Sequence, residues 1–193
     1  MNISIPLTAT EREFSGHSEL RILIRDCIAQ LPAAQRKLYD TYAPAAYGVI
    51  RRYMYNNEHA AQEILNDSFY KVFSKLETYS FQGAFEGWIR RIVVNTVTDH
   101  LRKGIKETQC AKEIQPEDAY VNSDSVERLS SKELLKVIDT LPDTQRLVFN
   151  LFVFENYSHK EIGKLLNINE NNSRWHLNDA RKRLKEKVQH LMK

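Results

Sequence analysis

The sequence contains few of the residues that interrupt helices and close tight turns. Its 193 residues include only 6 glycines and 5 prolines. No segment alternates valine, isoleucine or threonine with polar residues, as a half-buried strand does. Where apolar residues cluster, they recur at intervals of three and four, which is the helical period. We therefore expect an all-α protein, long enough to form two small helical domains.

Cysteine is also scarce. Cys27 and Cys110 are far apart and have no cysteine or histidine nearby at ligand spacing, which argues against a disulfide framework or a zinc site. Residues 1–14 lack the features of a signal peptide, and no apolar run approaches membrane-spanning length. The six histidines form no nucleophile, metal or phosphate-loop pattern with the carboxylates. We expect a cytoplasmic protein that is not an enzyme, has no cofactor or metal, and does not insert into membranes.

The net charge of +3 is small, but it is unevenly distributed. Residues 171–193 carry seven basic and two acidic side chains, whereas residues 104–125 carry two basic and five acidic ones. An approaching polyanion responds to this local potential, so the basic C-terminus favours a nucleic-acid partner. The acidic segment loses helical periodicity and contains Pro116, which is typical of a linker.

A segment near the C-terminus has the pattern of a helix-turn-helix. Ser158 and Glu161 form a capping box that starts a helix, and Asn167 ends it. Asn169 is a good N-cap for a second helix, which leaves a turn of the length that such units use. The small side chain of Gly163 allows the two helices to cross closely.

The second of these helices has one apolar and one polar face. A wheel of about 100° per residue gives a buried face that consists of Ser173, Leu177, Ala180 and Leu184. The side chains directed away from it, or on its flanks, are Asn171, Arg174, Trp175, Asn178, Arg181 and Lys182. Amides and guanidinium groups pair with base edges in the major groove, and lysines suit phosphates. A solvated basic face is the alternative, and a protein partner would also cover Trp175.

The N-terminal half is expected to form a series of helices. After a flexible polar lead, they are expected at residues 20–28, from Pro32 onward, at 58–76 and from about 86 to 103. Further helices are expected to start at Ser130 or Ser131 and at Pro142. On spacing alone, the polar face of residues 58–76 is a solvated surface.

An aromatic connection at residues 79–85 precedes the helix that starts near residue 86. Aromatic rings beside a basic helix suit single-stranded nucleic acid, because bases stack on rings and cations follow phosphates. Aromatic loops also cap hydrophobic cores, so the residues alone leave both interpretations open.

The order of these segments resembles the sigma-70 family of bacterial RNA polymerase initiation factors, specifically its two-domain extracytoplasmic-function (ECF) group. Three N-terminal blocks carry the resemblance: KLYDTYAPAAYGVIRRYM, AAQEILNDSFYKVFSKL and FEGWIRRIVVNTVTDHLRK. The C-terminal blocks are LPDTQRLVFNLFVFENYSHKEIGKLLNI and ARKRL. Together these blocks, in this order, are highly specific.

The resemblance implies a domain organisation and a set of partners. It implies an N-terminal lead (1–19), sigma domain 2 (20–103), an acidic linker that passes through the polymerase (104–125) and sigma domain 4 (126–193). Domain 2 would bind core RNA polymerase and the minus-10 element, and domain 4 would bind the minus-35 element. The implied partners are promoter DNA, the clamp and flap regions of core RNA polymerase, and a separate anti-sigma factor.

The resemblance also assigns roles to individual residues. Those that would bind the polymerase are Asn66, Asp67 and Lys71. Those near the minus-10 element would be Phe81, Gln82, Phe85, Arg91, Asn95, Asp99, His100, Arg102 and Lys103, although Phe81 or Phe85 would equally fill the core. Those at the minus-35 element would be Asn171, Asn172, Arg174, Trp175, Asn178, Arg181 and Lys182.

Four positions depart from the family pattern. Asn66 stands where a glutamine is common and Phe73 where a tryptophan is common, and both are mild changes. Ser173 stands where a β-branched apolar residue is usual, and Trp175 where a small polar one is usual. The expected function is promoter recognition and DNA opening as a subunit of RNA polymerase. The alternative is a dimeric helix-turn-helix regulator that binds duplex DNA without joining the polymerase.

Overall fold

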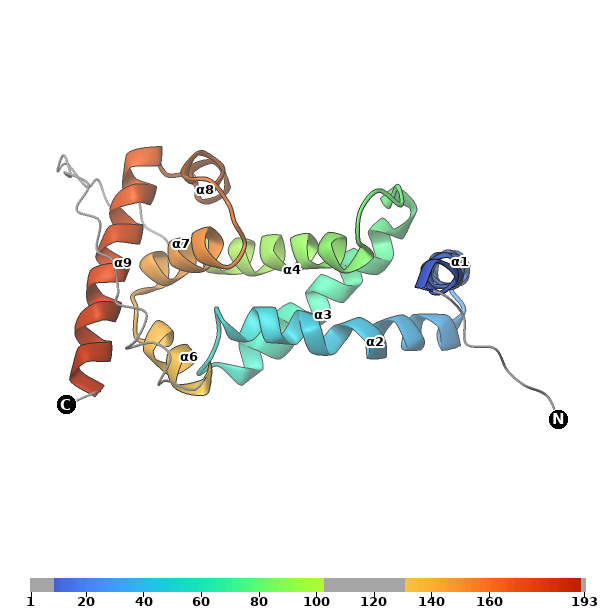
Figure 1. The fold of residues 1–193 in the computed structure, drawn as a ribbon, viewed down its shortest axis with the longest axis horizontal. Helices are drawn as coiled ribbons and strands as arrows, with labels where there is room; N and C mark the ends of the chain where they lie inside the picture. Colours follow the sequence, from blue (N-terminus) through green and yellow to red (C-terminus); the bar gives the residue numbers. More distant parts are fainter. Residues whose placement is uncertain (1–8, 103–130, 192–193) are drawn as a thin grey trace.

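The computed structural model describes residues 9–102 and 131–191 (Figure 1). The N-terminal elements are α1 (Ala9–Ile28), α2 (Pro32–Arg51), α3 (Glu58–Lys75), the 3-10 turn η1 (Leu76–Thr78) and α4 (Phe85–Arg102). The C-terminal elements are α6 (Ser131–Asp139), α7 (Asp143–Val153), α8 (His159–Leu166) and α9 (Glu170–Leu191). These ranges contain no strand, and the predicted all-α class is confirmed. The acidic linker, Cys110 and Lys103 lie outside the described residues.

Local signals account for most of the helix starts. Pro32 occupies the first turn of α2, where its missing N–H costs nothing and its fixed φ suits the helix. The Asn57 side chain accepts a hydrogen bond from the amide of Ala60 at 3.0 Å and so caps α3. Pro142 precedes α7 as expected. Each start follows from a short stretch of sequence.

The first helix differs from the expected one. α1 begins at Ala9, so residues 9–19, which we expected to be part of a flexible lead, are largely helical. Its C-terminal half is anchored, because Ile24 and Cys27 are buried against the rest of the N-terminal helices. The preceding residues include alanine, glutamate and arginine, which are good helix formers. The spacing of apolar residues alone did not predict these additional turns.

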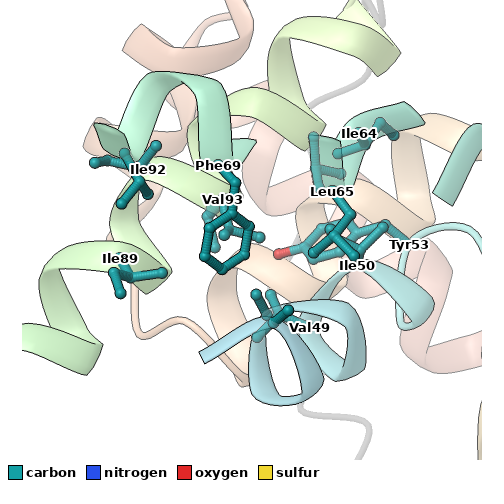
Figure 2. Close-up of a cluster of buried hydrophobic side chains, with 14 of the residues drawn as sticks. Val49, Ile50, Tyr53, Ile64, Leu65, Phe69, Ile89, Ile92 and Val93 are labelled. Carbon is teal, nitrogen blue, oxygen red and sulfur yellow. The ribbon is translucent and has the colours of Figure 1, made fainter. Parts of the chain in front are cut away.

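The N-terminal helices enclose a continuous apolar core. α2, α3 and α4 all pack against one another, and α1 packs on α2. Figure 2 shows part of this core, with side chains from these helices directed toward one another; those labelled are Val49, Ile50, Tyr53, Ile64, Leu65, Phe69, Ile89, Ile92 and Val93. Tyr53 is fully buried, and burial raises the pKa of its hydroxyl.

The C-terminal helices form a second packed group. α9 packs along α7 and also contacts α6 and α8. The four residues predicted to face its core, Ser173, Leu177, Ala180 and Leu184, are all buried. The two groups are themselves in contact: the largest cluster of buried residues runs from α1 to α9 and includes Val94, Leu147 and Leu151. In Figure 1, α7 and α8 lie beside one end of α4.

Candidate functional site

The helix-turn-helix has the predicted caps. In α8 the Ser158 hydroxyl accepts a hydrogen bond from the Glu161 amide at 3.3 Å, and the Ser158 amide donates to the Glu161 carboxylate at 2.8 Å. The Ser158 hydroxyl also donates to the Glu161 carboxylate at 2.6 Å, and this bond, followed by the one from the Ser158 amide, lowers the pKa of Glu161. Asn167 ends α8 in the left-handed conformation, and the Asn169 side chain accepts from the Asn172 amide at 2.7 Å. A Cβ on Gly163 would lie 2.8 Å from the carbonyl oxygen of Ile168, so the close approach requires glycine.

The outer face of α9 presents most of the residues expected at the minus-35 element. Asn171, Arg174 and Lys182 are exposed, and Trp175, Asn178 and Arg181 are half-buried. Arg174 is ion-paired with Glu170 one turn earlier, so part of its charge is balanced in the free protein. The guanidinium of Arg181 lies 5.8 Å from the ring centroid of Phe152. Asn172 differs from the others, because it is only 8% exposed and faces inward.

Ser173 faces a histidine inside the helix-turn-helix. The Ser173 hydroxyl is fully buried and lies 3.0 Å from Nδ1 of His159, at the start of α8. The His159 ring stacks on Phe152 with centroids 4.6 Å apart. Burial, and then the nearby Arg174, lower the pKa of His159. A polar contact between α8 and α9 therefore takes the place of the apolar contact that the family pattern leads one to expect.

The two phenylalanines of the aromatic loop between η1 and α4 lie in different environments. Phe85 is 4% exposed, and its ring stacks on Trp88 at 5.5 Å, so it fills the core. Phe81 is only half-buried and has a φ of 58°, in the left-handed region. The Tyr79 hydroxyl donates to the Gly83 carbonyl at 2.8 Å and closes the loop. Gln82 is exposed beside Phe81.

The exposed face of α4 continues from this loop. Arg91, Asp99, His100 and Arg102 are exposed, and Asn95 is half-buried. Asp99 forms ion pairs with Arg102 at 3.3 Å and with Lys71 of α3 at 3.8 Å. The second pair joins the surface expected to read DNA to the surface expected to bind polymerase.

The polar face of α3 carries the residues expected to bind polymerase. Asn66 and Asp67 are exposed, and Lys71 is half-buried by its contact with α4. The sequence analysis did not assign Tyr70 to the polymerase contact, but this residue is 76% exposed and lies on the same polar face. Its position next to Lys71 on the polar side of the helix was the available signal. A large ring so exposed on a polar face suits a protein contact.

A buried ionic cluster joins the two helical groups, and the sequence analysis did not identify it. Glu155, just after α7, has a side chain only 3% exposed. It accepts hydrogen bonds from Arg52 at 2.7 Å and from Arg90 at 2.6 Å. The hydrogen bond to Glu155 raises the pKa of Arg90. Asn150 adds a bond from its side-chain amide to the Arg52 carbonyl at 3.0 Å.

A polar pocket of about 460 Å³ lies alongside this cluster. Its lining comes from α4 and from the segment joining α7 to α8, and consists of Gly87, Arg90, Arg91, Val94, Phe154, Glu155, Asn156, Tyr157 and Glu161. Arg91 thus belongs both to the exposed face of α4 and to the pocket between α4 and the segment that joins α7 to α8. In residues 9–102 and 131–191, no group of three or more histidine, cysteine or acidic side chains is arranged to hold a metal ion. None of the helices described has the length and apolar character needed to cross a membrane.

Family models match the chain in two places. The model described as Sigma-70 region 2 matches residues 38–106, and the one described as Sigma-70, region 4 matches residues 131–184. These matches fall on the helices that carry the aromatic loop and on the helix-turn-helix.

Curated relatives cover most of the chain. The ECF RNA polymerase sigma factor SigE of Mycolicibacterium smegmatis is 27% identical over 160 residues, which are 78% of this chain and 60% of the relative. The ECF RNA polymerase sigma-E factor of Haemophilus influenzae is 26% identical over 167 residues, 80% and 87% of the two chains. SigW of Bacillus subtilis is 24% identical over 193 residues, 89% and 100% of the two chains.

A solved structure of the sigma factor RpoE from Bartonella quintana, in complex with the anti-sigma factor NepR, has 18% sequence identity and a TM-score of 0.47. It covers 78% of this chain and 94% of that one. The predicted family is confirmed by the two region models and the curated relatives, and a regulator that acts without the polymerase is not favoured. The chain belongs to the sigma-70 family, among the ECF sigma factors of RNA polymerase.

Proposed function

We propose that this sigma factor reads two promoter elements from two separate surfaces and opens the DNA between its contacts. α9 reads the minus-35 element, and the aromatic loop with α4 reads the minus-10 element. The observation that carries the second part is the half-exposed ring of Phe81 beside the polar face of α4. A half-exposed ring at this position suits stacking on an unpaired base, which a regulator that binds only duplex DNA does not require.

At the minus-35 element, the exposed and half-buried side chains of α9 make the contacts. The set consists of Asn171, Arg174, Trp175, Asn178, Arg181 and Lys182. Asn172 is left out because its side chain is turned inward. Each bidentate contact to a base edge contributes about 1–3 kcal/mol of discrimination.

At the minus-10 element, the protein binds a base that has left the duplex. Extrusion costs a few kcal/mol, and binding of the extruded base offsets that cost without nucleotide hydrolysis. Phe81 offers the stacking surface and Gln82 the hydrogen-bonding groups, whereas Phe85 is occupied in the core. The face of α4, with Arg91, Asn95, Asp99, His100 and Arg102, contacts the surrounding strand. Catalysis is left to the polymerase.

Core polymerase binds the polar face of α3 through its clamp and domain 4 through its flap. Asn66, Asp67 and Lys71 supply the α3 contact, and the exposure of Tyr70 on the same helix supports it. The proposed domains are residues 20–103 and 126–193, joined by a linker at 104–125. A separate anti-sigma factor and a cytoplasmic location complete the proposal.

In vitro transcription tests this function. The purified chain is combined with core polymerase on fragmented genomic DNA of the source organism, and transcript 5′ ends are mapped against reactions without the chain. A set of new start sites that share two spaced upstream motifs is expected. If no start site depends on the chain while it still binds core enzyme, the proposed promoter recognition is wrong.

A further inference from the structure

Arg21 of α1 makes a contact that the family match does not include. The match to region 2 begins at residue 38, and Arg21 lies outside it. The central carbon of its guanidinium nevertheless lies 4.2 Å from the ring centroid of Phe81 in the aromatic loop. α1 also packs against η1, which leads into this loop, and Figure 1 shows α1 beside it. A residue distant in sequence thus covers the half-exposed ring.

The Phe81 ring depends on such contacts for its position. Its backbone is in the left-handed region, which non-glycine residues rarely adopt unless surrounding contacts hold them there. Tyr79 contacts the ring with centroids 4.9 Å apart, and Arg21 lies over it. Phe81 also packs against the apolar core, so removing Arg21 would free the face of the ring that the guanidinium covers.

The guanidinium of Arg21 also lacks an ion-pair partner among the described residues. Over the part of the chain that the structure describes, Arg21 is exposed and takes part in no ion pair. Arg25, one turn later on the same helix, is bonded to the carboxylate of Asp26 at 2.9 Å. Arg21 therefore directs its planar cation at an aromatic ring, as a guanidinium does in a cation–π contact.

We propose that Arg21 is a positioning residue of the minus-10 site, where it holds the Phe81 ring in the orientation that stacks on the extruded base. This inference rests on the proposed function of the aromatic loop. The effect of Arg21 on DNA binding must therefore depend on the presence of the extruded base. An exposed cation–π contact corresponds to a change of about two- to fivefold in affinity.

The test measures how the holoenzyme binds promoter fragments with an unpaired minus-10 region. Fragments are taken from a promoter mapped as above and labelled for fluorescence anisotropy. Each non-template minus-10 nucleotide is, in turn, left intact or made abasic. The position at which the abasic substitution weakens wild-type binding most is taken as the extruded base. Arg21→Ala is expected to bind the intact fragment about two- to fivefold more weakly and to match wild type on the fragment that lacks this base.

Two further variants sharpen the test. Arg25→Ala removes a charge from the same helix and is expected to bind both fragments as wild type does. In a Phe81→Leu background, which lacks the ring, Arg21→Ala is expected to cause no additional loss. Circular dichroism and binding to core enzyme are compared for all variants, and both are expected to be unchanged.

The outcomes separate the inference from the function on which it rests. An equal loss for Arg21→Ala on intact and abasic fragments would show a general charge effect and overturn the positioning role, as would no loss on either. If no abasic substitution weakens the wild-type holoenzyme, the base-binding function of the loop is itself wrong, and the role of Arg21 is wrong with it. The wild-type data alone identify that case.

Discussion

Replacement of Glu155 by glutamine is expected to separate the two helical groups without unfolding either. Glutamine keeps the size of the side chain but removes the charge that faces Arg52 and Arg90, and its amide NH2 group replaces one of the two oxygens that accept hydrogen bonds from them. Loss of one partner from a buried ion pair costs about 3–5 kcal/mol, because the remaining charge is left without compensation. The Arg90 side chain is 43% exposed and the Arg52 side chain 20%, so water partly compensates both. We therefore expect about 3 kcal/mol, the lower end of that range.

This free energy is lost from the contact between the groups, since Glu155 follows α7 whereas Arg52 and Arg90 belong to the N-terminal part. A loss of about 3 kcal/mol changes the ratio of closed to open molecules by more than about a hundredfold. Separation also lets both arginines regain full hydration. Opening breaks the apolar and ionic contacts between the groups, whereas unfolding also breaks those within each group, so opening is the expected response of the variant.

Small-angle X-ray scattering of the full chain measures this opening as an increase in radius of gyration, and circular dichroism measures the helix content. Glu155→Gln is expected to expand while its helix content stays constant. Glu170→Gln is the matched control, because it breaks the pair with Arg174 within one exposed helix face, and it is expected to leave the radius unchanged. A lower unfolding temperature without expansion would show that the chain behaves as one cooperative unit, and this would refute the reasoning.

Three other predictions concern the proposed surfaces and the helix-turn-helix. Arg174→Ala is expected to lower promoter affinity about 5- to 150-fold, equivalent to 1–3 kcal/mol, with unchanged binding to core enzyme; equal loss of both activities would indicate misfolding. Asp67→Arg is expected to weaken core binding about tenfold or more, as like-charge contacts do, without altering the circular dichroism spectrum; gel filtration with core enzyme measures this, and normal co-elution would contradict it. Burial lowers the pKa of His176, so its neutral form stabilises the fold above about pH 6.5 and this contribution is lost as the pH falls further. Urea unfolding at pH 7.5 and 5.5 should show lower stability at pH 5.5, with a smaller difference in His176→Gln; a difference unchanged by that substitution would assign the effect to other groups.

Features that depend on neighbouring residues were predictable. The capping box at Ser158, the end of α8 at Asn167 and the buried face of α9 follow from hydrogen bonds within one turn or from a helical period. The inward orientation of Asn172 had a signal as well. It directly precedes buried Ser173 and lies four residues before buried His176, so it sits at the edge of the apolar face.

Features that depend on distant residues were not predictable. Glu155 lies 103 residues from Arg52 and 65 from Arg90, and no local pattern selects these partners from the many charged residues of the chain. The aromatic loop contains two phenylalanines, Phe81 and Phe85, and the sequence alone did not distinguish which of them fills the core. Only the fold shows that Phe85 fills the core, because the left-handed backbone at Phe81 turns that ring aside.

The contact at Gly163 has a consequence for how promoter preference can change. α8 meets the following turn through main-chain atoms: the Ile168 amide donates to the Gly163 carbonyl at 3.0 Å, and there is no room for a Cβ. The crossing of the two helices is therefore held by this backbone contact together with the buried contact between His159 and Ser173, and neither involves the outward side chains of α9. Residues such as Asn171 and Arg174 are free to be exchanged without reorienting the helix that bears them. New target sequences are thus accessible by single substitutions, with the scaffold left intact.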